Sequence, residues 1–240
     1  MAELTGSVAE PSPNVGDAFS WVARDPEWIG KLLLMGLIGI IPIVGALQQA
    51  GWLLAMLDNL RAGRYEVPPA GFRYATRGVW LWLAAFIYGL VLFIVMYGII
   101  VVFIIVIVAS SQSHSDGHAG SASPLAVLLI PLFFVWLAVL GFVSLASWIF
   151  VPALIEFTDR KALGGAFDIP GMLRAIREDP QHNLAAAGLA FVAYFIGGLG
   201  SYLCWIGVIF TFPYALTVLA GVLRWYEVSV KPGTLPAKVV

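Results

Sequence analysis

Four long stretches without a charged residue constrain the fold of this chain more than any other feature. They are residues 32–57, 79–108, 125–151 and 184–223. Each is longer than the roughly 18–20 apolar residues that an α-helix needs to cross a bilayer. Only 11% of the 240 residues are charged, whereas a soluble domain usually carries about 25%. The pattern predicts an all-α, polytopic helical membrane protein with four to six membrane segments.

An internal repeat links the beginning of the chain to its last third. The segment 14–25 recurs 154 residues later as 168–179, and each copy runs into an Asp-Pro pair. In both copies the apolar residues follow the spacing i, i+3, i+4, i+7, which places them on one face of a helix. Since each copy leads into an uncharged run, we predict two amphipathic helices that lie in the membrane interface. The alternative for the first copy is ordinary packing against the protein's own loops.

Four residues are candidates for the membrane interface. Phe19, Trp21 and Val22 belong to the first copy of the repeat, and tryptophan favours the level of the lipid headgroups. Glu156 follows the third apolar run and precedes Asp159 and two basic residues. We therefore expect Glu156 to be an interfacial carboxylate, with an intramembrane gate as the alternative.

Prolines and glycines interrupt two of the apolar runs. Pro42 and Gly45 should break or kink the first run, because proline removes a backbone donor and glycine loosens packing. This run then either spans once or folds back as a re-entrant hairpin, and the repeat favours the hairpin. The last run is long enough for two segments, 184–203 and 205–223, and Pro213 should kink the second.

The distribution of basic residues predicts the topology. Loops 58–78 and 152–183 each hold four Lys or Arg residues, whereas loop 109–124 holds none. The positive-inside rule makes the first two loops cytoplasmic and the third external. With a hairpin in the first run, both termini of this multi-pass inner-membrane protein are cytoplasmic. The expected divisions are a disordered tail (1–13), a single membrane domain (14–225) and a cytoplasmic tail (226–240).

Few side chains carry chemistry. Gln48, Gln49 and Thr211 are the candidate intramembrane polar positions, which either line a path or hydrogen-bond a neighbouring helix. His114 and His118 could share a helical face as metal ligands, but their Ser- and Gly-rich surroundings favour an external loop. No catalytic, cofactor-binding or metal residue is predicted. The four runs contain no Asp, Glu, His, Lys or Arg, which disfavours an ion-coupled transporter. No basic stretch interleaved with aromatic residues predicts nucleic-acid binding.

Several short motifs resemble known membrane families. They are Asp25-Pro26-x-Trp28-x-x-Lys31, the run Ile41-Pro42-Ile43-Val44-Gly45, then Gly51 and Arg61. Together they are similar to a family of uncharacterised bacterial and archaeal polytopic membrane proteins, known only as a domain of unknown function, over about residues 14–225. The later Val151-Pro152-Ala153-Leu154-x-Glu156 with Ala166-Phe167 resembles the membrane part of some glycerophosphodiester phosphodiesterases. In those enzymes the catalytic work belongs to a separate soluble domain, so the resemblance implies no catalytic residue here.

The sequence favours a non-enzymatic integral membrane protein. We expect a structural, accessory or lipid-organising component, or a subunit of a larger complex, whose partners are membrane lipids, other membrane subunits or a second copy. The alternative is a channel or transporter for a neutral or lipidic substrate, since repeats with broken helices recur in transporters. A membrane enzyme is the third possibility.

Overall fold

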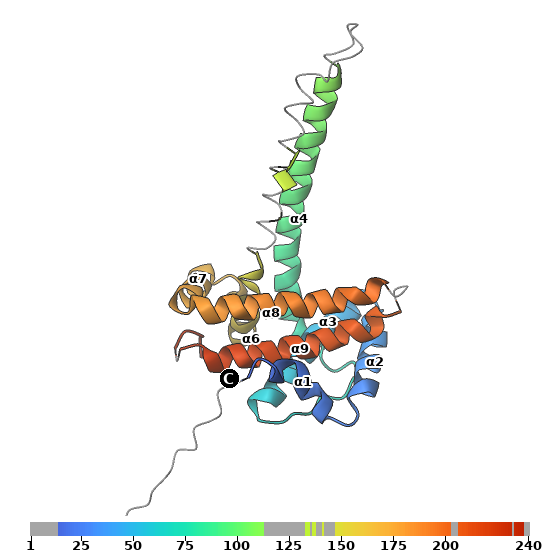
Figure 1. Cartoon of the computed structure of the whole chain (residues 1–240), viewed down its shortest axis with the longest axis vertical. Helices are drawn as coiled ribbons and strands as arrows, with labels where there is room; N and C mark the ends of the chain where they lie inside the picture. The colour runs from blue at the N-terminus through green and yellow to red at the C-terminus, as the bar shows by residue number, and fades with distance from the viewer. Residues whose placement is uncertain are drawn as a thin grey trace, which may run out of the picture.

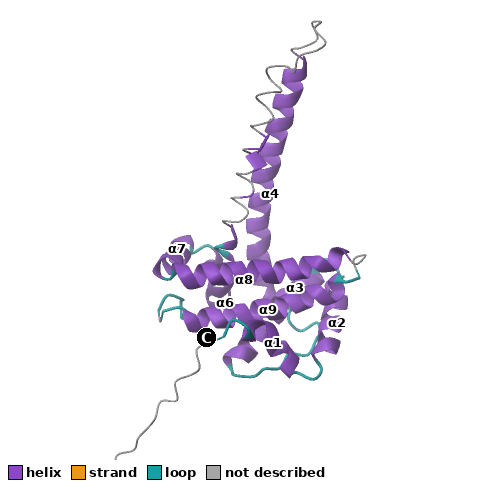
Figure 2. Ribbon diagram, viewed as in Figure 1, coloured by secondary structure: helices purple, strands orange, loops and turns teal. Residues whose placement is uncertain are grey.

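The computed structural model describes residues 14–112, 133–134, 136–137, 141, 147–202, 206–231 and 233–237. Within these residues the structure has helices and no β-strand (Figure 2), so the all-α part of the prediction is confirmed there, whereas the four to six membrane segments stay a prediction. In chain order the elements are α1 (Asp17–Ser20), η1 (Trp21–Arg24), α2 (Trp28–Gly39), α3 (Val44–Arg61), α4 (Ala75–Gln112), α6 (Val151–Ala166), α7 (Ile169–Glu178), α8 (Pro180–Leu199), η2 (Gly200–Tyr202) and α9 (Val208–Ser229). The expected tail 1–13 and both loop histidines, His114 and His118, lie outside the described residues.

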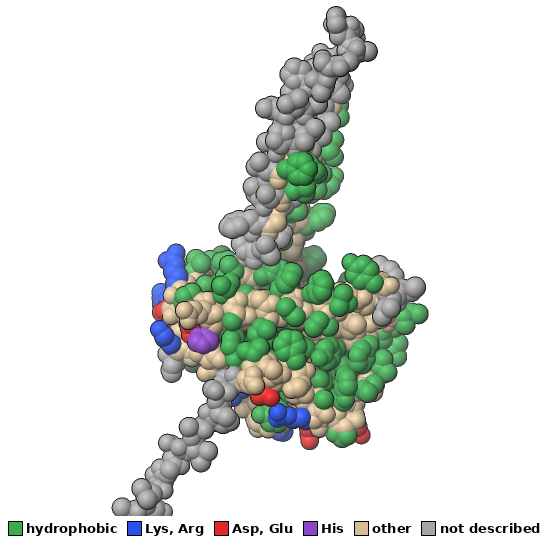
Figure 3. All heavy atoms as spheres, in the orientation of Figure 1, with side chains coloured by type: hydrophobic (Ala, Val, Ile, Leu, Met, Phe, Trp, Pro, Cys, Tyr) green, Lys and Arg blue, Asp and Glu red, His purple; other side chains and the backbone are tan. Residues whose placement is uncertain are grey.

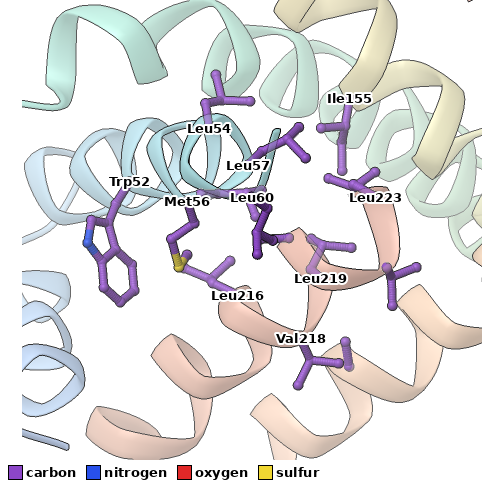
Figure 4. Close-up of a cluster of buried hydrophobic side chains, with 14 of the residues drawn as sticks. Trp52, Leu54, Met56, Leu57, Leu60, Ile155, Leu216, Val218, Leu219 and Leu223 are labelled. Carbon is purple, nitrogen blue, oxygen red and sulfur yellow. The ribbon is translucent and has the colours of Figure 1, made fainter. Parts of the chain in front are cut away.

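Helix α9 is the centre of the helical body. Every residue from 215 to 223 is buried, and the helix packs against α1, α2, α3, α6 and α8. A helix that is apolar on all sides requires such enclosure. In Figure 4, Met56, Leu57 and Leu60 of α3 point toward α9 and form one apolar cluster with Leu219. The body is therefore built around the last long helix of the chain.

Three described helices are long and apolar enough to cross a membrane. They are Ala75–Val102, Pro180–Tyr202 and Val208–Ser229, and they overlap the predicted segments 79–108, 184–203 and 205–223. Most of the predicted segment 125–151 lies outside the described residues. The first apolar run contributes α2 and α3, neither of which belongs to this set.

The first apolar run folds into a hairpin of two helices. Helix α2 ends at Gly39, α3 begins at Val44, and Ile43 in the connection has a φ of 63°. A Cβ atom built on Gly45 would lie 2.5 Å from the carbonyl oxygen of Ile38. The close approach of the two helices beside Pro42 therefore requires a glycine.

A proline and a glycine form the crossing of α2 and α9. Helix α9 continues through Pro213, which has no N–H to bond the carbonyl group of Ile209 four residues earlier. That carbonyl faces α2, since a Cβ atom built on Gly36 would lie 1.7 Å from its oxygen. Because Gly36 has no side chain, the backbones of α2 and α9 can meet at the carbonyl that Pro213 leaves without a donor. This arrangement suits a weak Cα–H···O hydrogen bond from Gly36 to the carbonyl of Ile209.

Helix α4 has a packed base and an exposed stem. Leu81 and Ala84 in the base are buried, whereas no described side chain is buried from residue 89 to the end of the helix. Figure 1 shows the stem rising away from the body, with α8 and α9 running across its foot. At 1.5 Å per residue, residues 89–112 extend about 36 Å, close to the roughly 30 Å of a bilayer's hydrocarbon core.

The first expected surface helix is packed inside the body. Helices α1 and η1 cover residues 17–24 and lie against α9. Trp21 and Val22 are 1% and 2% exposed, and Nε1 of Trp21 donates to the carbonyl of Thr217 at 3.0 Å. Phe19 is partly buried against the same core. Protein rather than lipid therefore covers this apolar face, which agrees with the alternative of packing against the chain itself, and the headgroup level of Trp21 stays a prediction.

The second copy of the repeat forms α7, a longer helix than α1. Asp168 caps it by accepting a hydrogen bond from the backbone N–H of Gly171 at 3.0 Å. Asp179 caps the following helix α8 through the N–H of His182 at 3.4 Å. In the first copy, by contrast, Asp25 precedes α2 by three residues. The two copies therefore differ in structure.

Candidate functional site

The candidate intramembrane glutamines are used in local packing. Nε2 of Gln48 donates to the carbonyl of Phe72 at 2.7 Å, and its Oε1 accepts from the N–H of Tyr74 at 2.8 Å. These bonds hold the segment before α4 against α3. Gln49 packs on α2, since a Cβ atom built on Gly39 would lie 2.1 Å from its Nε2.

Thr211 joins α8 to α9. Its Oγ1 donates to the carbonyl of Gly197 at 2.9 Å and lies 3.1 Å from that of Gly207. A Cβ atom built on Gly200 would lie 2.2 Å from the same hydroxyl, so the turn between the helices closes tightly around it. Thr211 and Gln48 thus form hydrogen bonds between segments at separate places, and Gln49 packs against α2.

Glu156 lies in a cluster of opposite charges where α3, α4, α6 and α9 meet. At its centre the guanidinium group of Arg61 contacts four carboxylates. Its Nη1 lies 2.6 Å from Asp159 and 3.1 Å from Asp58, its Nη2 lies 3.2 Å from Glu156, and its Nε lies 2.8 Å from Glu227. Hydrogen bonds between ionised groups are the strongest in proteins.

Three further arginines complete this arrangement. Arg160 pairs with both glutamates, at 3.2 and 2.8 Å. Arg77 pairs with both aspartates, at 3.2 Å from Asp159, and Arg224 lies 3.4 Å from Glu227. We call these eight residues the ionic cluster: Asp58, Arg61, Arg77, Glu156, Asp159, Arg160, Arg224 and Glu227. Four formal positive charges face four formal negative charges, so the cluster neutralises itself.

Glu156 is the most deeply buried member. Its side chain is 0% exposed, and its Oε1 has no hydrogen-bond partner among the described residues. Burial, followed by the charge of Glu227, raises the pKa of Glu156 well above the usual range of a glutamate. Arg61 and Arg160 thus hold Glu156 inside the protein, next to one of the basic residues that follow it in the sequence, and its position at a membrane interface stays a prediction.

A pocket of about 280 Å³ opens beside the cluster. Asp58, Arg77 and Asp159 form its polar side, and Trp80 is among its apolar walls. Ala162, also at the pocket, has a φ of 52° and a ψ of −146° within α6, a conformation that favours glycine and costs an alanine about 1–3 kcal/mol. Both aspartates bind arginines, so the pocket's charges serve to join helices. Among the described residues no group of three or more metal-ligating side chains occurs.

The sequence indicates Glu156 and its basic neighbours, of which Arg160 is a partner, but it does not indicate the contact with Arg61. A local signal exists, because charged residues recur three positions apart, a spacing that places both members of a pair on one face of a helix. The pairs are Asp58 with Arg61, Glu156 with Asp159, and Arg224 with Glu227. Each pair also borders an apolar run. Nothing in the spacing shows, however, that the three pairs meet.

Comparison with known proteins gives one match. A family model described as a protein of unknown function (DUF4013) matches residues 34–223, a range that contains the ionic cluster except for Arg224 and Glu227. None of the curated proteins and none of the solved structures matches the chain. The match fits the resemblance to an uncharacterised family, whereas the likeness to phosphodiesterase membrane parts stays a prediction.

Proposed function

The chain belongs to the DUF4013 family of proteins of unknown function, and from this premise we propose that it is a non-enzymatic integral membrane protein, an accessory or lipid-organising component of a membrane assembly. The observation that carries the proposal is the ionic cluster. Its eight side chains join the ends of α3, α4 and α9 to the middle of α6. The arrangement suits a rigid scaffold.

The energetics of buried charge favour this reading. Asp159, Glu156 and Glu227 have side chains that are 3%, 0% and 5% exposed. Separating such a group from its partner leaves a buried charge uncompensated, at a cost of about 3–5 kcal/mol. A sliding or rocking helix at this point would break several such pairs at once. The cluster therefore acts as a clamp on the helix ends.

The surface of the body supports a membrane location. Large apolar side chains are exposed on α2, on α8 and on the stem of α4, for example Leu37, Phe195 and Phe93, at 53%, 60% and 62%. Figure 3 shows hydrophobic side chains spread across the middle of the visible face, with charged side chains gathered at its edges. Exposed apolar surface of this extent marks contact with lipid or a partner.

The proposal also gives the orientation of the protein in the membrane. The cluster draws its residues from the two arginine-bearing loops and the end of α9. The positive-inside rule favours placing these parts in the cytoplasm of a cell with the protein in its inner membrane. Both termini then lie on the cytoplasmic side, and the end of the α4 stem lies outside.

A channel or transporter for a neutral or lipidic substrate is the second candidate. It is favoured by the hairpin of α2 and α3, whose connection holds Ile43 at a positive φ, because discontinuous helices recur in transporters. The buried, protonatable Glu156 also suits a protein that changes state. A transporter would have to open and close the ionic cluster, and the cost of breaking its buried ion pairs opposes such a movement.

Extraction of the full chain in native lipid discs, followed by mass spectrometry of the intact particle, tests the proposal. We expect a stoichiometric second membrane protein, a second copy, or a fixed complement of lipid. A lone chain that carries neither protein nor lipid, and that moves solutes across vesicle membranes, would contradict it.

A further inference from the structure

An open groove of about 740 Å³ runs along α7. Phe167, Ile169 and Leu173 form its apolar wall, and Arg174 and Arg177 stand at its polar edge. We call this the α7 groove. It belongs neither to the ionic cluster nor to the pocket beside it.

The apolar wall is left over after α7 has packed on the body. Met172 and Ala175, on the inner face, are buried with Phe157 of α6 in a small core of their own. Phe167 and Ile169 are nevertheless 48% and 46% exposed. Apolar side chains of this size gain free energy when they leave water. The wall is thus available to an apolar ligand.

The two arginines make no ion pair with a described residue, although the positive charge of Arg174 acts on the carboxylate of Asp168, which is paired with Lys161 at 3.0 Å. Each arginine of the ionic cluster binds at least one carboxylate, whereas neither Arg174 nor Arg177 makes a hydrogen bond or ion pair with a residue that the structure describes. They lie three positions apart on a helix, and so share a face. Glu178 also lines the groove, which leaves one net positive charge at the edge. The groove is therefore complementary to an anion.

The groove lies at the foot of the α4 stem. The ring of Phe167 stacks on that of Tyr88 with 6.3 Å between centroids, and the Tyr88 hydroxyl donates to the carbonyl of Ala166 at 2.6 Å. Tyr88 is the residue at which α4 leaves the body, since no described side chain beyond it is buried. In Figure 1, α7 lies at the edge of the body from which the stem rises. The groove thus opens where the membrane-crossing part of α4 begins.

We propose that the α7 groove binds an anionic phospholipid, with its phosphate between Arg174 and Arg177 and its acyl chains over Phe167, Ile169 and Leu173. This inference rests on the proposed membrane function and names the lipid class that the protein would organise. The planar guanidinium group matches the geometry of phosphate oxygens. Free phosphate would leave the apolar wall in water, and a zwitterionic lipid would bring a cation next to the arginines.

The test measures binding of phosphatidylglycerol and phosphatidylcholine to the full-length protein in detergent, by native mass spectrometry. The variant Arg174→Gln/Arg177→Gln removes both groove arginines. The control Arg64→Gln/Arg73→Gln removes the same charge from two exposed arginines elsewhere. We expect the wild type and the control to prefer phosphatidylglycerol. The groove variant should bind it about thirtyfold more weakly, from roughly fivefold for each of two cations near the membrane surface. Arg174→Lys/Arg177→Lys should bind phosphatidylglycerol more weakly than the wild type and more tightly than the glutamine variant, because it keeps the charge but loses the planar guanidinium group.

Three results would overturn the inference. They are equal affinity for the two lipids in the wild type, equal losses in the groove variant and the control, and displacement of the bound lipid by millimolar inorganic phosphate. Because both arginines are exposed and unpaired among the described residues, the variants should melt like the wild type, so weaker binding would not reflect unfolding. A variant that loses lipid preference but still co-purifies with a partner protein supports both proposals. Unchanged lipid binding beside an intact partner complex would remove this inference alone.

Discussion

Nη1 of Arg61, at the end of α3, lies 2.6 Å from Oδ2 of Asp159, in α6 and 98 positions further along the chain. The same guanidinium group bonds Glu227 on α9. One side chain therefore joins three helices, and it does so at a place where carboxylates are almost fully enclosed. We regard this contact as the centre of the fold as well as of the candidate site.

Replacing Arg61 should destabilise the protein strongly. Arg61→Gln leaves four carboxylates without their shared cation, and loss of one partner from a buried charge pair costs about 3–5 kcal/mol. Unfolding of the detergent-solubilised full chain, followed by circular dichroism, measures the change. The control is Arg64→Gln, because Arg64 is exposed and such changes stay within about 0.5 kcal/mol. Equal effects at the two positions would show that the cluster does not stabilise the fold.

The stability should depend on pH through Glu156. Since burial and Glu227 raise the pKa of Glu156, the folded chain holds this proton more tightly than the unfolded chain. The resulting stabilisation is complete at pH values below the ordinary pKa of a glutamate, which applies to the unfolded chain. It is lost as the pH rises toward the higher pKa of Glu156 in the folded chain. Glu156→Gln has no proton to lose, so its melting temperature relative to the wild type should increase from about pH 5 to about pH 8. A difference that is constant over this range would contradict the assignment.

The sequence predicts those features of the fold that depend on local hydropathy. The uncharged runs predict the helices around Ala84, Ala190 and Ala220. This prediction needs only the length and the apolarity of a single segment. They cannot tell which surface an apolar face meets. The pattern that includes Trp21 and Val22 is the same whether lipid or α9 covers it.

The ionic cluster could be predicted only in part, for a similar reason. The pairs of charged residues three positions apart can be seen in the sequence. Arg61 and Glu227, however, lie 166 positions apart, and their contact depends on how α3 and α9 cross. Glu156 was expected at an interface because it borders a basic stretch. In the folded chain the arginines that face its carboxylate come from two helices, and the sequence alone does not show that these helices meet.

The crossing of α2 and α9 should tolerate no side chain at Gly36. Gly36→Ala forces a Cβ atom into the carbonyl of Ile209, and overpacking of this kind costs about 1–3 kcal/mol. Gly30→Ala is the matched control, since nothing lies within 4 Å of its Cβ position on the same helix. The control should be neutral or gain up to about 1 kcal/mol from helix propensity. Equal melting temperatures for the two variants would contradict the close approach.

Relief of the backbone at Ala162 should stabilise the protein. Ala162→Gly suits the positive φ, so we expect a gain of about 1 kcal/mol in the free energy of unfolding. The same change at Ala85, an exposed residue in the regular part of α4, should cost about 1 kcal/mol, because glycine is a poor helix former. The two variants should therefore shift the melting temperature in opposite directions. A loss at both positions would show that Ala162 is not strained.

We propose that the ionic cluster is a fixed clamp, and the distance between the helices that it joins tests this proposal most directly. Spin labels at Ala85→Cys in α4 and Val228→Cys in α9, in a chain carrying Cys204→Ser, report this distance by pulsed electron resonance in lipid vesicles. Both labelled positions are exposed. A clamp gives one narrow distance population, which broadens when Arg61→Gln is added. Two separate populations in the chain with Arg61 intact would show a moving gate, and would contradict the accessory role in favour of transport.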